Sequence, residues 1–380
     1  MSANLIAIND MSNAAIHARV CRAGLCGWLA LLLQLFAARH GALAASEAVC
    51  GKSKAGDLTG LSLSELYNLD VIQLNVLGGH THPAGQAMFG YQFMHMNMGE
   101  LHQGTKVISA ADIFANTPFT TAHILMEMDM HMFEFMYAPS DRLTLMAMLP
   151  YKEMSMLHQV NTGARFTQRA SGIGDVEVMA LWTLLGDIRK GGHRLILNAG
   201  LSLPSGSIDV TDHRSGNPAL PMVQLEYPMQ LGSGTFDLMP GLTYVGESGH
   251  WSWGAQTIET LRLGENDADY TYGNQYRLSA WLAYGITDWC APSVRLDGRW
   301  WEDVAGADPR LASNTTPESR PNLQGGRRLD LLFGLNLYAP GGMIKGNRLM
   351  IEGGFPVYQN LDGPQLGMSW IINIGWNYAF

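Results

Sequence analysis

From about residue 87 to the C-terminus, apolar and polar side chains alternate in segments of 9–14 residues. This period of two is that of a β-strand, because successive side chains leave opposite faces of the backbone. The alternation predicts twelve strands, near residues 87–98, 124–137, 142–151, 174–185, 194–204, 234–247, 251–264, 274–287, 290–303, 327–339, 348–359 and 367–380.

The breaks between these strands differ in length. Those after even-numbered strands are short, whereas most of those after odd-numbered strands are long, at residues 99–123, 152–173, 205–233 and 304–326. An even number of strands, with short turns on one side and long loops on the other, is typical of barrels in the Gram-negative outer membrane. We therefore predict an all-β, antiparallel transmembrane outer-membrane β-barrel of about twelve strands over residues 87–380.

The last segment favours a barrel over a soluble β-sandwich. Its even positions from Trp370 to Phe380 are all large and apolar, with aromatic residues at both ends, and its odd positions include Asn373 and Gly375. One face therefore suits lipid and the other suits a lumen. Sandwich strands also alternate, but they do not place large aromatic side chains outward. The terminal Phe380 is also the residue type usually found where the outer-membrane assembly machinery binds a barrel.

The N-terminal region predicts export. Arg19 and Arg22 precede an apolar run over 25–36, and the small-residue site Ala42-Leu43-Ala44 follows it. Together these features are typical of a cleaved signal peptide over residues 1–44. The run is too short for a transmembrane helix, which needs about 20 residues. Residues 45–86 are predicted to form a periplasmic segment with one short amphipathic helix within 57–73. The predicted location is therefore the cell outer membrane.

Charge and cysteine content exclude further classes. The net charge of −9, with no basic cluster, argues against nucleic acid as a partner. Cys21 and Cys26 lie within the predicted signal, which leaves Cys50 and Cys290, and whether these two pair is left open. The predicted partners are instead the lipid of the outer membrane and a small solute or metal ion.

Three stretches resemble the outer-membrane transporters of the MetA-pathway phenol-degradation family: Gly174-Asp-Val-Glu-Val-Met-Ala-Leu-Trp182, Leu201-Ser-Leu-Pro-Ser-Gly-Ser-Ile-Asp209 and Leu231-Gly-Ser-Gly-Thr-Phe-Asp-Leu-Met-Pro-Gly-Leu-Thr-Tyr244. The resemblance covers most of residues 170–380 and implies a barrel that transports a small solute. The His80-Thr-His82-Pro stretch and the methionine-rich first strands resemble a subgroup that is associated with copper, so the resemblance implies a role with copper.

Methionine occupies one face of the first three predicted strands. In 124–137 all five methionines occupy even positions, whereas Phe133, Phe135 and Tyr137 are odd, so the methionines are predicted to face the lumen. Thirteen of the 22 methionines lie between residues 88 and 156, and seven of the 12 histidines lie within 80–158. This pattern puts Glu127, Asp129 and His131 on the outward face, either above the membrane or beside a bulge that switches faces.

A row of thioethers has two interpretations. Thioether sulfur is a soft ligand that selects Cu(I), and imidazole can hold either oxidation state of copper. The candidate metal ligands are Met94, Met96, Met98, Met126, Met128, Met130, Met132, His95 and His131, with Cu(I) as the one candidate cofactor. Alternatively, the methionines fill irregular space, and the lumen is a passive channel for small apolar or aromatic compounds.

Signatures of an enzyme are missing from the sequence. It contains no Gly-x-Ser-x-Gly elbow, no His-Glu-x-x-His helix and no phosphate-binding loop. Two charged groups, Arg295, Asp297 and Arg299, and Arg327, Arg328 and Asp330, are predicted to line the lumen and to pair with one another. We therefore predict a protein without catalytic activity, and an outer-membrane enzyme is the least favoured alternative.

Overall fold

The computed structural model describes residues 76–189, 191–311 and 314–380. All the described residues belong to one compact unit, Leu61–Phe380. The predicted signal peptide, the predicted helix within 57–73 and Cys50 lie outside the described residues. No helix in the described part of the chain is long and apolar enough to cross a membrane.

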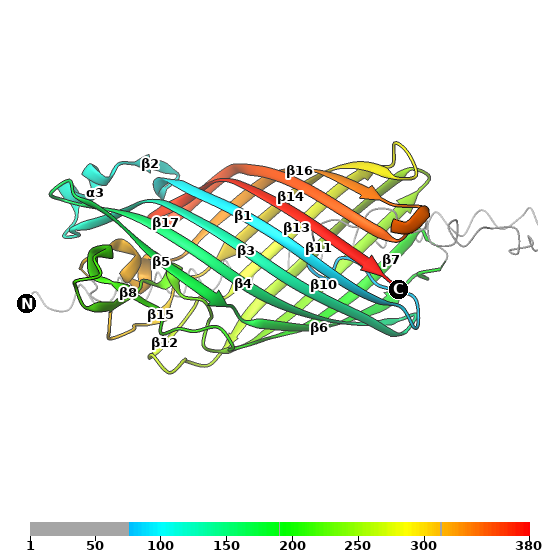
Figure 1. Ribbon diagram of the computed structural model, residues 1–380, viewed down its shortest axis with the longest axis horizontal. Helices are drawn as coiled ribbons and strands as arrows, with labels where there is room; N and C mark the ends of the chain where they lie inside the picture. The colour runs from blue at the N-terminus through cyan, green and yellow to red at the C-terminus, as the bar shows by residue number, and fades with distance from the viewer. Residues whose placement is uncertain (1–75, 190, 312–313) are drawn as a thin grey trace, which may run out of the picture. The chain divides into compact units, whose positions relative to one another are not determined.

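Eleven strands form a closed antiparallel barrel, in which each strand pairs with its neighbours and the last pairs with the first (Figure 1). They are β1 (Ala87–Gly104), β3 (Thr121–Ser140), β4 (Leu143–Val160), β6 (Val176–Leu185), β7 (His193–Leu203), β10 (Phe236–Ser248), β11 (Trp251–Leu263), β13 (Gln275–Tyr284), β14 (Cys290–Trp301), β16 (Gly326–Tyr338) and β17 (Asn347–Ala379). The predicted all-β antiparallel barrel is confirmed.

The last strand, β17, contributes two passes of the chain. Residues 348–361 pair with β16, and residues 361–379 pair with β1. A closed ring of antiparallel neighbours needs an even number of passes, because direction reverses at every neighbour, so β17 must fold back on itself. The backbone N–H of Met368 donates to Oε1 of Gln359 (2.8 Å) across this fold. Counting β17 twice gives the twelve passes that the sequence predicts.

Short turns and the C-terminus lie at one end of the barrel (Figure 1). The C-terminal Phe380 is fixed there by two backbone hydrogen bonds with Ala87, of 2.8 and 2.9 Å. The turn between β16 and β17 carries η7 (Gly342–Ile344). By the usual rule for outer-membrane barrels, this is the periplasmic end. Recognition of Phe380 by the assembly machinery stays a prediction.

Long connections lie at the other end. They include β2 (Lys106–Ile108), α3 (Ala110–Asn116), β8 (Thr211–His213), η3 (Arg214–Gly216), β9 (Met222–Gln224), η4 (Tyr227–Met229), β12 (Tyr270–Thr271), β15 (Ala305–Gly306), η5 (Pro317–Ser319) and η6 (Pro321–Leu323). Helix α3 begins at Ser109, whose Oγ accepts a hydrogen bond from the Asp112 backbone N–H (3.2 Å), while the Asp112 carboxylate accepts from the Ser109 N–H (2.8 Å). This reciprocal cap lets so short a helix form.

The predicted loop over residues 152–173 is wrong. Strand β4 continues to Val160 and pairs with β5 (Arg165–Ile173), so the sheet extends well past the expected strand end. The outward side chains there include Glu153 and Ser155, which suit water rather than lipid. The inward Met154 and Met156 are buried. Strand β1 likewise continues to Gly104.

The two faces of the wall are as predicted. In the last pass, Trp370, Ile372, Ile374, Trp376, Tyr378 and Phe380 are all exposed, whereas Ile371, Asn373 and Asn377 are buried. Phe133, Phe135 and Tyr137 of β3 are also exposed, and Met126 and Met136 are buried. An apolar outer band with aromatic residues, around an interior of polar and methionine side chains, is that of an outer-membrane barrel.

Candidate functional site

The barrel encloses a cavity of about 400 Å³. Every one of the eleven barrel strands contributes at least one lining side chain, so this cavity is the lumen itself. One arc of its lining is rich in methionine and another is rich in arginine, and we call these the methionine wall and the charged wall.

Three neighbouring strands, β1, β3 and β4, supply most of the methionine wall. Met94 of β1, Met130 and Met132 of β3, and Met146 and Met148 of β4 all line the cavity. This arrangement follows from the period of two in the sequence, since these residues occupy the inward positions of paired strands. Glu134 of β3 and Lys152 of β4 also line this part of the cavity. The methionine side chains themselves are apolar and polarisable, and thioether sulfur makes favourable contacts with aromatic rings.

The charged wall comes from β11, β13, β14 and β16. Asp297 accepts hydrogen bonds from Nε of Arg277 (2.7 Å) and Nε of Arg299 (2.9 Å). Nε of Arg328 donates to Asp330 (2.9 Å). The predicted pairing of lumen charges is confirmed for these groups, but Arg327 is exposed and does not belong to the wall.

The periplasmic end of the lumen holds chain from before the first strand. Asn198 donates from Nδ2 to the carbonyl of Gly78 (2.9 Å), and Gln256 donates from Nε2 to that of Leu77 (2.8 Å). Gly78 has a φ of +58°, and a Cβ there would lie 2.9 Å or less from three side-chain atoms, so glycine lets the backbone approach this closely. The alternation of the strands gives no indication of this insertion.

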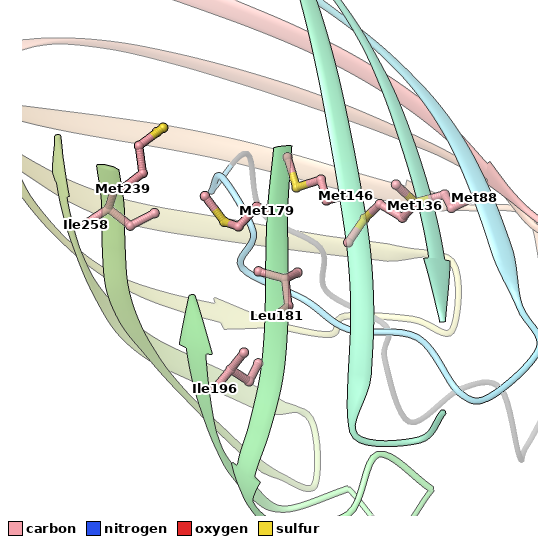
Figure 2. Packing of buried hydrophobic residues seen from close by; sticks show 8 residues of the cluster. All are labelled: Met88, Met136, Met146, Met179, Leu181, Ile196, Met239 and Ile258. Atoms are coloured by element: carbon pink, nitrogen blue, oxygen red, sulfur yellow. The ribbon is translucent and has the colours of Figure 1, made fainter. Parts of the chain in front are cut away.

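Leu77 packs against a buried cluster at the same end of the lumen. Figure 2 shows its eight members on neighbouring strands: Met88, Met136, Met146, Met179, Leu181, Ile196, Met239 and Ile258. Five of the eight are methionine, which fits the irregular space between a curved wall and an inserted segment.

At the other end, the connection between β7 and β10 folds into the barrel. Leu225, Met229 and Leu231 of this connection pack against Met126 and Met156, among other wall residues. Hydrogen bonds hold it there. Nζ of Lys152 donates to the carbonyl of Leu231 (2.8 Å), and the Asp175 carboxylate accepts from the N–H groups of Gly206 (2.9 Å) and Ser233 (2.7 Å).

Comparison with known proteins gives the family. The family model described as "Putative MetA-pathway of phenol degradation" matches residues 120–316, which is just over half of the 380 residues. The chain belongs to this family. No curated protein matches the sequence.

Solved structures that resemble this member of the phenol-degradation family are outer-membrane barrels. An outer-membrane channel from Pseudomonas putida F1 has a TM-score of 0.58 at 12% identity, with 81% of this chain and 100% of that chain covered. The transport unit of the autotransporter AIDA-I from Escherichia coli has a TM-score of 0.44 at 8% identity, covering 83% of this chain and 98% of that chain. At 12% identity, the likeness to the Pseudomonas channel shows the fold alone.

This family member brings several of the predicted methionine ligands together. Met94, Met96, Met98 and Met128 share one packed cluster with Met368 of β17. Met126 packs instead with the inserted connection, and Met130 and Met132 line the open cavity. Sequence reasoning missed Met368 because the pass of β17 over residues 361–379 carries no other methionine that would make a row.

The two predicted histidine ligands lie apart from the methionines. Nδ1 of His95 is 2.6 Å from Oδ1 of Asp129, and Nδ1 of His131 is 2.7 Å from the Tyr91 hydroxyl. These pairs occupy the outward face, since β1 and β3 pair without a register shift from residue 126 to 137. The bulge of β3 lies further along, between His123 and Leu125. The prediction that His95 and His131 share one ligand set with the methionines is therefore wrong, because both histidines point away from the lumen.

Proposed function

We propose that this protein is an outer-membrane channel for small aromatic molecules that carry one polar group, of which a phenol is the simplest. The observation that carries the proposal is the division of one lumen cavity into a methionine wall and an arginine-rich wall. A molecule with an aromatic ring and a hydroxyl or carboxylate would satisfy both walls at once.

The chemistry of each wall supports this substrate class. Sulfur to aromatic contacts contribute about 0.3–1.5 kcal/mol each, enough to favour an aromatic ring without trapping it. On the charged wall, Arg277 and Arg299 each donate a hydrogen bond from Nε to Asp297, and their side chains are 25% and 35% exposed. Each guanidinium has five N–H donors in all, so donors face the cavity for a polar group of the solute.

Passage requires movement at both ends of the cavity. Leu77 lies in the periplasmic end and Leu231 in the other, and the backbone carbonyl of each accepts a hydrogen bond from a side chain of the barrel wall. Such contacts can open locally without unfolding of the barrel wall. The family description supports an aromatic solute, because it refers to phenol degradation.

The experiment is solute efflux from liposomes that contain the purified barrel. We expect phenol to leave faster than glucose, relative to protein-free liposomes, and we expect Met130→Gln and Met132→Gln together to reduce the phenol rate several-fold. Arg189→Gln, on an exposed side chain, is the control and should have no effect. Equal protein-dependent rates for phenol and glucose, or no protein-dependent efflux, would contradict the proposal.

A second candidate function is binding of Cu(I) in the lumen. The five methionines of the cluster around Met96 and Met368 favour it, since several soft neutral ligands converge there. A Cu(I) competition titration of the wild type beside a variant with Met94, Met96, Met128 and Met130 all changed to Leu tests it. Loss of binding in the variant supports a copper site, and equal binding in both leaves these methionines as packing. The absence of catalytic activity stays a prediction.

A further inference from the structure

Two buried histidines face each other at the outer ends of β3 and β4. His123 and His158 are directly opposite in the strand register, and their ring centroids lie 4.4 Å apart. From Met126 to Ala138 the inward residues of β3 are even-numbered, so His123 reaches the interior because the bulge at Ile124 shifts the alternation by one. Bulges re-aim side chains in this way.

Two carboxylates from separate connections complete the cluster. Nε2 of His123 is 3.8 Å from Oε1 of Glu226, in the connection between β7 and β10, and its Nδ1 is 3.2 Å from Oε1 of Glu318, on η5. Ligand atoms of His123, His158 and Glu226 all lie within 4.8 Å of one another. Three of the four side chains are at most 3% exposed, and that of Glu226 is 12% exposed.

Most polar atoms of this cluster lack hydrogen bonds. Both ring nitrogens of His123 and of His158, Oε2 of Glu226 and both carboxylate oxygens of Glu318 are buried without a hydrogen-bond partner of normal geometry. Two of these seven atoms, Nδ1 of His123 and Oε1 of Glu318, face each other as an ion pair at 3.2 Å. Buried polar groups are nearly always satisfied, so the other five require an explanation. Packing does not explain why these residues are polar, because apolar residues of similar size would fill the same space.

We propose that His123, His158 and Glu226 bind a divalent transition-metal ion, with Zn²⁺ as the expected occupant. Two imidazoles and a carboxylate are borderline ligands that suit zinc rather than Cu(I). Nε2 of His123 would be the ligand atom, and its Nδ1–H would donate to Glu318, an arrangement in which a carboxylate orients a metal-bound histidine. In a tetrahedral zinc site the ligand atoms are about 3.4 Å apart, so small side-chain rotations suffice.

The electrostatics of the cluster fit a bound cation. Two carboxylates face His123: Oε1 of Glu318 lies 3.2 Å from its Nδ1, and Oε1 of Glu226 lies 3.8 Å from its Nε2. The two carboxylates therefore favour a positive charge at this point, and a metal ion would displace the His123 proton.

Such an ion would link the barrel wall to the connection that fills the lumen. His123 and His158 belong to the wall, whereas Glu226 precedes η4 and lies between Leu225 and Met229. One metal ion would therefore hold the inserted residues against β3 and β4.

The test is a Zn²⁺ titration of the tag-free, chelator-treated full chain in detergent, in competition with a chromophoric zinc indicator. We expect one zinc ion per chain with submicromolar affinity. His158→Gln and Glu226→Gln should each weaken binding more than 100-fold, and Glu318→Gln should weaken it by about 10–100-fold, as is usual for a residue that orients a ligand.

His102→Gln is the matched control, because His102 is a buried histidine near Glu100 at the same end of the barrel, outside the cluster. It should bind zinc as the wild type does, and so should the variant with four methionines changed to Leu. Heat-dependent electrophoretic mobility shows whether each variant is folded. No zinc binding by the wild type, or equal binding by folded His158→Gln and Glu226→Gln variants, would overturn the proposal, as would an equal loss in His102→Gln.

Discussion

Arg295 and Glu352 form a buried bidentate ion pair inside the barrel, with Nε 2.8 Å from Oε1 and Nη2 2.6 Å from Oε2. The two residues come from β14 and β17, which lie on either side of β16. Both side chains are at most 5% exposed. The pair therefore connects two strands that share no backbone hydrogen bonds, in an interior where an unpaired charge is costly.

Removing one partner of this pair should destabilise the barrel strongly. In Glu352→Ala the Arg295 guanidinium stays buried without its bidentate partner. Its other ion pair in the structure, with Asp297, is longer, at 3.7 Å. We expect a loss of about 3–5 kcal/mol in the free energy of unfolding, measured by urea titration in detergent. Arg189→Ala breaks a pair whose side chains are 55% and 44% exposed and should cost less than about 1 kcal/mol. Similar losses in the two variants would contradict this view.

The charge of Asp297 should set the ion preference of the lumen. It is the shared acceptor of Arg277 and Arg299, so Asp297→Asn leaves the charged wall more positive. We expect the permeability ratio of chloride to potassium to rise several-fold, measured from the reversal potential across planar bilayers in a salt gradient. Arg299→Gln should shift the ratio in the opposite direction. Shifts of the same sign in both variants would mean that neither charge faces the conducting path.

The strands could be predicted from the sequence because lipid contact on one face requires apolar side chains at every second position. Exposed Trp370 and Phe133 lie on one face, while buried Asn373 and Met126 lie on the other. Beyond the membrane, the outward side chains of β4 are polar and its inward ones are apolar, as at Glu153 and Met154. The sequence wrongly predicts a loop there, because the outward face no longer carries the apolar residues that contact lipid.

The contents of the lumen could not be predicted in the same way. Leu77 and Leu231 lie inside the barrel because they contact strands that are far away in the sequence. The alternation of residues within one strand gives no information on such contacts. The bulge at Ile124 is equally hidden, because one extra residue reverses the face of His123 without changing the composition of the segment. Methionine rows were predicted correctly as inward, but their packing partners depend on these insertions.

Gly78 should control how firmly the N-terminal segment stays in the lumen. Gly78→Ala puts a Cβ within 2.9 Å of Met179, Leu181 and Asn198 and also strains a backbone φ of +58°. We expect the segment to leave the lumen more often, seen as faster proteolysis before Ala87 and higher single-channel conductance. Gly85→Ala is a matched control, because Gly85 has a φ of +86° but open space around its Cβ position. Both variants bear a similar backbone cost of about 1–2 kcal/mol, so any difference between them reports the contacts of Gly78. Equal behaviour would mean that the segment does not block the pore.

Asp175 should determine how often the outer end of the lumen opens. Its two carboxylate oxygens accept the backbone N–H groups of Gly206 and Ser233, which lie near the two ends of the connection between β7 and β10. Asp175→Ala leaves both donors without this acceptor, and hydrogen bonds to a charged group contribute about 1.5–3 kcal/mol each. We therefore expect the open fraction in single-channel recordings, and the phenol efflux rate, to rise at least tenfold.

Asp187→Ala is the control for this prediction, because Asp187 also accepts a backbone N–H, that of Arg189 (2.9 Å), but in a turn at the periplasmic end. It should leave the open fraction unchanged. If Asp175→Ala folds and its open fraction equals that of the wild type, the inserted connection does not gate the channel. The route for the solute must then lie between this connection and the charged wall, where Arg299 is the first residue to change.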